Sequence, residues 1–193
     1  MSVAPRRTED LLYSGCRMNA DEFFSLGETD ARFELMDGAL IVSPSPTPLH
    51  QHILIKLGAQ LDAAQSAGAP IAFFADTDVR FSRTHVYPPD LSVYAASRLI
   101  GIPNKLEFAP DLVIEIISPS SKGTDLIGKR EDYDRFGVNE YVVIDPTQCR
   151  AYFWQRRGER LLEQPVEADS IVSSLGITIS LAPLWAICKS VTS

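Results

Sequence analysis

One carboxylate lies inside an apolar run, where its charge needs a partner. Pro110 to Pro119 reads PDLVIEIISP, a short segment rich in β-branched residues and bounded by prolines, with Glu115 in its middle. Such a segment predicts a strand that is buried on both faces. An ionised carboxylate in that environment is costly unless a cation, a metal ion or hydrogen bonds compensate it. Glu115 is therefore either half of a buried ion pair or part of a functional site.

Two further acidic residues fall at strand positions. Asp90 directly follows Pro89, where we expect a strand to begin. Glu34 lies in the first arm of an expected hairpin, on the opposite face from Phe33 and Leu35. Two carboxylates on neighbouring strands can share a divalent cation, and oxygen ligands suit Mg²⁺. A third carboxylate can hold a second ion or orient a water molecule.

Two basic residues face inward by their helical spacing. His50 lies on the apolar stripe of a helix expected over residues 50–67, and Lys129 shares a helix face with Tyr133. A histidine on an apolar face is more often a satisfied core residue, and Lys129 could instead pair with Asp125 at the surface. Beside a metal-bound water, however, a lysine lowers the pKa of the water or stabilises charge on a phosphate.

The elements that would position these residues alternate between helix and strand. The segment of Glu115, a helix around Lys129 and the apolar run 140–145 form a strand–helix–strand crossover, which predicts two parallel strands. The other expected elements are a helix after Asn19, a hairpin at Asp37-Gly38, strands 78–81 and 87–94, a β-meander over 151–181 and a short helix near Trp185. We expect an α/β (α+β) fold with a mixed sheet flanked by helices, in which residues 1–17 are an extension and residues 18–193 are one domain.

Composition narrows the function. The chain has 193 residues and a formal net charge of −7, which argues against non-specific coating of nucleic acid but allows an acidic metal site. Its 3 cysteines lack a CxxC pair, which suggests a reducing cytoplasm without a disulfide frame or a zinc site. No apolar run is long enough for a membrane span, and no signal peptide, phosphate loop or HExxH motif is present.

Taken together, these segments resemble the Uma2 family of restriction-endonuclease-like proteins, which share the PD-(D/E)xK nuclease fold. The resemblance runs from about Met18 to Trp185. It rests on six segments: FELMDG at 33–38, the Ser43-Pro44 connector leading to His50, Pro89-Asp90-Leu91, PDLVIE at 110–115 with Ser118-Pro119-Ser120, Asp125 with Lys129 and Tyr133, and Gly137-Val138 leading to Glu140-Tyr141 and Asp145-Pro146.

The resemblance implies a site for Mg²⁺ or Mn²⁺ and DNA as the substrate. Asp90 matches the first metal ligand and Glu115 the acidic residue of the (D/E)xK element, with Ile116 as a further ligand position. Glu34 and His50 complete the expected catalytic set. The lysine expected two residues after Glu115 is replaced by Ile117, and Lys129 on the following helix matches the position from which this family recruits a lysine instead.

Two alternatives stay open at this point. Lys122, in the preceding loop, is the second candidate for the site lysine, whereas Asp111 lies four residues from Glu115 and is interpreted as a strand-start residue. The chain could also be a catalytically weak or inert binding module on the same fold. We expect a homodimer, with the apolar C-terminal third that carries Trp154 and Trp185 as the source of its interface.

Overall fold

The computed structural model describes residues 15–27, 32–117, 124–167 and 169–191. Its helices and strands follow one another in this order: α2 (Ala20–Ser25), β1 (Arg32–Met36), β2 (Ala39–Ser43), α3 (Pro48–Ser66), β3 (Ile71–Ala75), β4 (Val79–Ser82), β5 (His85–Tyr87), β6 (Leu91–Ala95), the 3₁₀ turn η1 (Ala96–Arg98), β7 (Leu112–Ile116), the π-helical η2 (Thr124–Lys129), α4 (Arg130–Arg135), β8 (Glu140–Asp145), β9 (Arg150–Arg157), β10 (Arg160–Gln164), β11 (Ser170–Val172), β12 (Thr178–Ser180) and α5 (Ala182–Val191).

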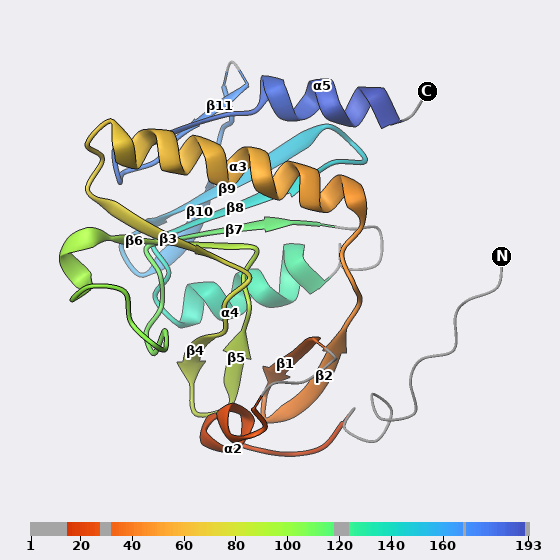
Figure 1. Cartoon of the computed structure of the whole chain (residues 1–193), viewed down its shortest axis with the longest axis vertical. Helices are drawn as coiled ribbons and strands as arrows, with labels where there is room; N and C mark the ends of the chain where they lie inside the picture. Colours follow the sequence, from red (N-terminus) through yellow and green to blue (C-terminus); the bar gives the residue numbers. More distant parts are fainter. Residues whose placement is uncertain (1–14, 28–31, 118–123, 168, 192–193) are drawn as a thin grey trace, which may run out of the picture.

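A six-stranded mixed sheet forms the centre of the molecule. Its strand order is β10-β9-β8-β7-β6-β3, and β7 and β8 pair in parallel, as the crossover predicted. Helices α3 and α5 cover one face and α4 lies against the other (Figure 1). All five residues of β7 are buried, because each face of the strand packs under one of these helical layers. The confirmed α+β architecture therefore places Glu115 inside the protein.

A second, four-stranded sheet has the order β2-β1-β5-β4. Its β1–β2 hairpin turns at Asp37 and Gly38, both of which have positive φ. The expected continuous strand 87–94 is wrong, since β5 belongs to this sheet and β6 to the central one. Pro88 and Pro89 lack N–H groups and cannot continue a ladder, so the chain changes sheets there. This corner leaves Asp90 between the two sheets.

The helices begin close to where their capping residues indicate. The side chain of Asn19 caps α2 and forms a capping box with Glu22. Helix α3 begins at Pro48 with Thr47 as its cap, so His50 lies in its first turn. The helix expected around Lys129 is instead a π-helical segment followed by the short α4, which ends before Gly137 at φ 81°.

The C-terminal third largely matches the expected meander. Strands β8, β9 and β10 follow one another in antiparallel order after the crossover, and β11 and β12 form a separate hairpin before α5. Trp154 and Trp185 are only 5% and 7% exposed, so neither supplies an apolar surface for a second copy. The expectation that Trp154 and Trp185 contribute to a dimer interface is therefore wrong. Formation of a homodimer stays a prediction.

Two remaining expectations concern the N-terminal extension and membrane-spanning helices. Of the expected N-terminal extension, residues 15–17 are described, and they hydrogen-bond to β2 through Gly15 N–H to Leu40 O (2.8 Å) and Leu40 N–H to Cys16 O (2.9 Å). In the described part of the chain, no helix combines the length and apolar character needed to cross a bilayer.

Candidate active site

The two sheets and the segment before α4 meet around a group of buried charged side chains. Glu34 comes from β1, Asp90 from the corner before β6, Glu115 from β7 and Lys129 from the end of η2. All four are buried, with exposures of 9%, 5%, 4% and 6% respectively. The chain thus brings together the residues that sequence reasoning had selected from four separate segments.

Lys129 bridges the carboxylates of the two sheets. Its Nζ atom donates to Glu34 Oε1 at 3.1 Å and to Glu115 Oε1 at 3.4 Å. A lysine this deeply buried is not the surface partner that the alternative interpretation required, so that alternative is wrong. The crossover sets this geometry, because the chain that leaves β7 must return over the same sheet before β8.

Asp90 is held in place by three neighbours. Its Oδ2 atom accepts the main-chain N–H of Ile116 at 2.7 Å and lies 3.0 Å from Nε2 of His50. The N–H of Asp90 in turn points to Glu115 Oε2 at 3.4 Å, so the two acidic residues are adjacent. His50 is therefore a neighbour of the site and not merely a core residue.

The His50 ring has one unsatisfied nitrogen. Since the Asp90 carboxylate accepts, Nε2 carries the hydrogen and Nδ1 is left as an acceptor in the neutral ring. Within the described residues, this buried Nδ1 has no hydrogen-bond partner. The contact between His50 and Asp90 therefore fixes the orientation of the ring.

Tyr133 is a site residue that sequence reasoning placed on the correct helix face but did not assign to the site. Its hydroxyl donates to Glu115 Oε1 at 2.7 Å. Complete burial, reinforced by the charge of Glu115, raises the pKa of Tyr133 well above its usual range, so the hydroxyl keeps its proton. The available signal was its spacing of four residues after Lys129, which puts both side chains on one face.

Arg32 and Asp78 are two more charged residues near the site that the sequence pattern did not single out. Arg32 forms an ion pair with Asp76, and its guanidinium lies 4.0 Å from Asp90 Oδ1. Burial, with the nearby charge of Asp76, raises the pKa of Asp78 to about 6, and Arg32 only partly offsets this. No periodicity marks either residue, because Arg32 begins a strand and Asp78 precedes one.

Three further residues were considered from the sequence: Asp111, Ile117 and Lys122. Asp111 accepts hydrogen bonds from Ala95 N–H at 2.8 Å and from the Asn139 side chain at 3.0 Å, which agrees with a structural role at the strand start. Ile117, where the motif lysine would stand, is buried in an apolar cluster with Tyr133. Lys122 lies outside the described residues.

The donor set suits a hard divalent cation with few protein ligands. Of the three buried carboxylates, those of Glu34 and Glu115 contact the ammonium of Lys129, and that of Asp90 lies 4.0 Å from the Arg32 guanidinium. In the part of the chain that is described, no three Asp, Glu, His or Cys side chains are grouped so that they could hold an ion. Mg²⁺ is commonly held by only one or two carboxylates and keeps several waters, so the adjacent Asp90 and Glu115 fit it.

Fold and site together define a restriction-endonuclease-like protein, with a mixed central sheet that presents acidic residues beside a lysine. The model of the Uma2 family, described as "Putative restriction endonuclease", matches residues 20–183. The chain belongs to the Uma2 family.

A solved structure supports the same fold. The chain is similar to a protein from Anabaena variabilis ATCC 29413 described as "a putative nuclease belonging to DUF820", with 24% identity and a TM-score of 0.75. The match covers 89% of this chain and 99% of that one. No curated protein matches the chain.

Proposed function

We propose that the protein is a divalent-metal-dependent DNA endonuclease that hydrolyses phosphodiester bonds. The observation that carries the proposal is the buried Lys129, which contacts Glu34 and Glu115 while Asp90 lies next to Glu115. Membership of a family described as restriction endonucleases supports a nuclease with DNA as its substrate. Such a lysine supplies the charge that the motif position at Ile117 lacks.

Asp90, Glu115 and the main chain at Ile116 would hold Mg²⁺ or Mn²⁺. A bound ion supplies a water of lowered pKa and neutralises developing charge on the phosphate. Ile116 N–H and His50 orient the Asp90 carboxylate, and the Tyr133 hydroxyl orients that of Glu115. Tyr133 is thus a positioning residue, because it acts through Glu115.

Lys129 and Glu34 carry out the remaining chemistry in this proposal. The ammonium of Lys129 stabilises negative charge on the phosphate or on the attacking water, inside a site where low solvation strengthens the interaction. Glu34, 3.1 Å from Nζ, holds the lysine side chain toward Glu115. Neither role requires a lysine on the strand itself.

The test measures nicking of supercoiled plasmid with Mg²⁺ or Mn²⁺ by the wild type and by Glu115→Gln. We expect the wild type to nick the plasmid and Glu115→Gln not to do so. EDTA should abolish nicking by the wild type. The exposed Glu167→Gln is the matched control, since it makes the same change between β10 and β11. Nicking that Glu115→Gln leaves intact would overturn the assignment of the site.

The second proposal is a catalytically inert binding module on the same fold, which the net charge of −7 favours. A metal titration separates the two. For the endonuclease, Mg²⁺ at one hundred times Kd should add about 2.7 kcal/mol to the unfolding free energy of the wild type through ligand linkage and so raise its melting temperature. Asp90→Asn should remove that shift. A wild type that shows neither the shift nor nicking is the inert module.

A further inference from the structure

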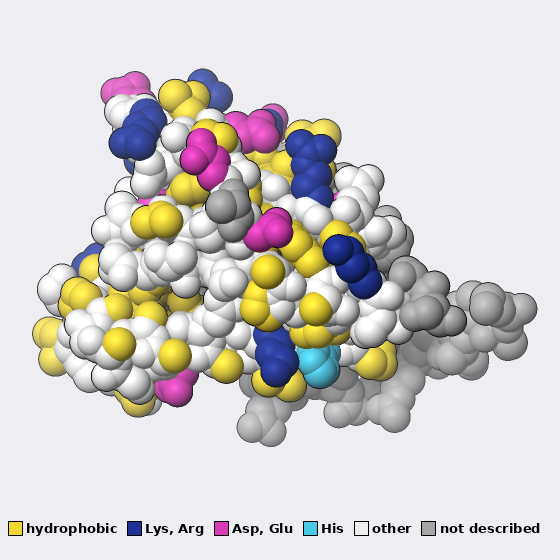
Figure 2. Space-filling model, turned by 90° about the horizontal axis from the view of Figure 1, so that it is seen from above, with side chains coloured by type: hydrophobic (Ala, Val, Ile, Leu, Met, Phe, Trp, Pro, Cys, Tyr) yellow, Lys and Arg dark blue, Asp and Glu magenta, His cyan; other side chains and the backbone are white. Residues whose placement is uncertain are grey.

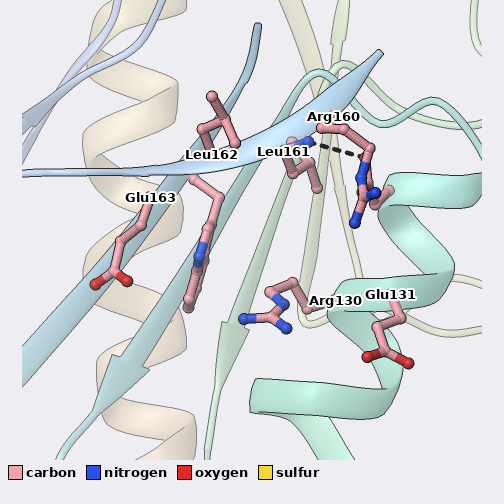
Figure 3. Close-up of a pocket in the computed structure, with 8 residues that line it drawn as sticks. Arg130, Glu131, Arg160, Leu161, Leu162 and Glu163 are labelled. Carbon is pink, nitrogen blue, oxygen red and sulfur yellow. Dashed lines mark hydrogen bonds and ion pairs between the residues drawn. The ribbon is translucent and has the colours of Figure 1, made fainter.

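A cavity opens beside the candidate active site, between α4 and the β9–β10 hairpin. It has a volume of about 270 Å³ and is lined by Arg130, Glu131, Trp154, Arg160, Leu161 and Glu163, among others. Figure 3 shows Arg130 and Glu131 on α4 across from Arg160 to Glu163 on β10, with the Leu162 side chain pointing away from Arg130. Apolar and charged groups thus meet in one hollow.

Buried aromatic rings of the core pack between the cavity and the catalytic centre. Tyr133, which hydrogen-bonds to Glu115, lies 5.0 Å from the ring of Tyr141. Tyr141 in turn stacks on Trp154 at 5.5 Å. The backbone gives a second connection, since Arg130 directly follows the buried Lys129. The cavity therefore borders the helical segment that carries Lys129 and Tyr133.

The guanidinium of Arg130 forms no ion pair with the described residues. It lies 5.8 Å from the centre of the Trp154 ring, and no carboxylate of the described residues is within ion-pair distance of it. The neighbouring Asp134, by contrast, is already paired with Arg156 at 3.2 Å and with Arg160 at 2.8 Å. Arg130 is thus the basic group of the cavity that is free to bind a ligand.

The charges around the cavity favour a neutral ligand over a phosphate. Once Asp134 is paired, the acids that remain are Glu131 and Glu163, and a phosphate would face both of them. Glu163 pairs directly across from Trp154 in the β9–β10 ladder, so an acceptor lies beside the ring and Arg130 provides donors over it. A planar group with donors and acceptors along one edge suits this arrangement.

We propose that this cavity is a subsite for one unpaired nucleobase of the DNA strand that reaches the active site. The idea rests on the proposed nuclease function and narrows its substrate to DNA that is single-stranded, or locally unpaired, next to the cut. A base in a duplex has its Watson–Crick edge occupied and is stacked on both faces, so it cannot enter. Stacking against one arginine also suits this acidic protein, because it does not depend on a wide basic surface.

The face over α3 and α5, on the opposite side of the central sheet from α4, does not offer an extensive basic contact (Figure 1 and Figure 2). Figure 2 shows acidic and basic side chains interspersed on the face over α3 and α5, without a basic patch on that side. Non-specific grip on duplex phosphates needs clustered Lys and Arg, which that face does not offer.

The test measures binding of a labelled oligonucleotide to the protein by fluorescence anisotropy, in EDTA so that cleavage is suppressed. The probes are a single strand, its duplex and a strand of abasic sugars with the same length. We expect the wild type to prefer the single strand over the other two. Arg130→Met should weaken single-strand binding about tenfold and leave the other two probes unchanged. Arg157→Met, an exposed arginine at the hairpin turn, is the matched control and should change binding by less than about twofold.

Trp154 provides an independent readout. The sequence has only 2 tryptophans, so Trp185→Phe leaves Trp154 as the sole fluorophore, and the single strand should quench it. Equal losses in Arg130→Met and Arg157→Met, tight binding of the abasic strand, or preference for the duplex would each overturn the subsite. If single-strand binding behaves as expected but nothing is cleaved, the subsite stands and the endonuclease proposal fails.

Discussion

Lys129 and Glu115 are 14 positions apart in the sequence, yet Nζ of Lys129 lies 3.4 Å from Oε1 of Glu115. The position two residues after Glu115, where a motif lysine would stand, holds the buried Ile117. Ile117 packs with Tyr133 on the α4 side of the central sheet. The segment before α4 thus provides the ammonium group of Lys129 next to Glu115, and the chain keeps an apolar residue at position 117, directly after β7.

The first prediction concerns the charge of Lys129. Lys129→Met keeps the length of the side chain but leaves Glu34 and Glu115 buried without their cation. The free energy of unfolding in EDTA should fall by about 3–5 kcal/mol, and plasmid nicking should fall by about 10²-fold. Urea unfolding and the nicking assay measure the two effects. Lys56→Met, on the exposed face of α3, is the control, and equal behaviour of the two variants would remove Lys129 from the site.

The second prediction separates two histidines of α3. His50 contacts Asp90, whereas His52 is exposed. His50→Ala should raise the Mg²⁺ concentration needed for half-maximal nicking about tenfold or more, as for other residues that orient a metal ligand. His52→Ala should leave it unchanged. If both variants require the same Mg²⁺ as the wild type, His50 is only a core residue.

The third prediction compares two buried tyrosines. The Tyr133 hydroxyl donates to the Glu115 carboxylate at 2.7 Å, and that of Tyr94 donates to the neutral Phe108 carbonyl at 3.1 Å. Because hydrogen bonds to charged groups are the stronger ones, Tyr133→Phe should cost about 1.5–3 kcal/mol of unfolding free energy and Tyr94→Phe about 1 kcal/mol. Only Tyr133→Phe should also weaken Mg²⁺ binding by calorimetry. The reverse order of costs would contradict this account of Glu115.

The fourth prediction is a pH dependence at Asp78. Its pKa in the folded protein is raised to about 6, above the unfolded value, so the folded state binds the extra proton between about pH 4 and 6. The charge of Asp78 therefore destabilises the protein as the pH rises through that window. In EDTA at pH 7.5, Asp78→Asn should be more stable than the wild type by about 1–2 kcal/mol, after allowance for partial solvent screening.

That difference should shrink as the pH is lowered to 4.5, where the wild-type carboxyl is protonated in the folded state. Chemical denaturation at the two pH values measures it. The exposed Asp62→Asn on α3 is the control, and its effect should not change with pH. A constant difference for Asp78→Asn would show that its titration is not coupled to folding.

Local signals determined much of the architecture from sequence. Asn19 and Glu22 mark the start of α2, Asp37-Gly38 marks the hairpin, and the apolar run around Glu115 marks a buried strand, because capping, positive φ and burial depend on near neighbours. The crossover to β8 followed from the order of strand and helix alone.

The candidate site was only partly determined in this way. Helical spacing indicated that Lys129 faces inward, but its contact with Glu34 at 3.1 Å forms only because the second sheet packs against the first. Pro88 and Pro89 moved β5 and β6 into different sheets, which neither alternation nor composition predicted. The involvement of Arg32, Asp78 and Tyr133 likewise arises from contacts between distant segments.

The sequence by itself therefore determined many of the helices and strands and the inward position of Glu115, His50 and Lys129. Only the tertiary structure decided how those residues pair and where the cavity beside Trp154 opens. The physical reason is range: backbone propensity and hydrophobic periodicity act within a few residues, whereas the contact of Asp90 with His50 and Ile116 joins groups 40 and 26 positions away. Distances over such separations are set by packing of the whole core.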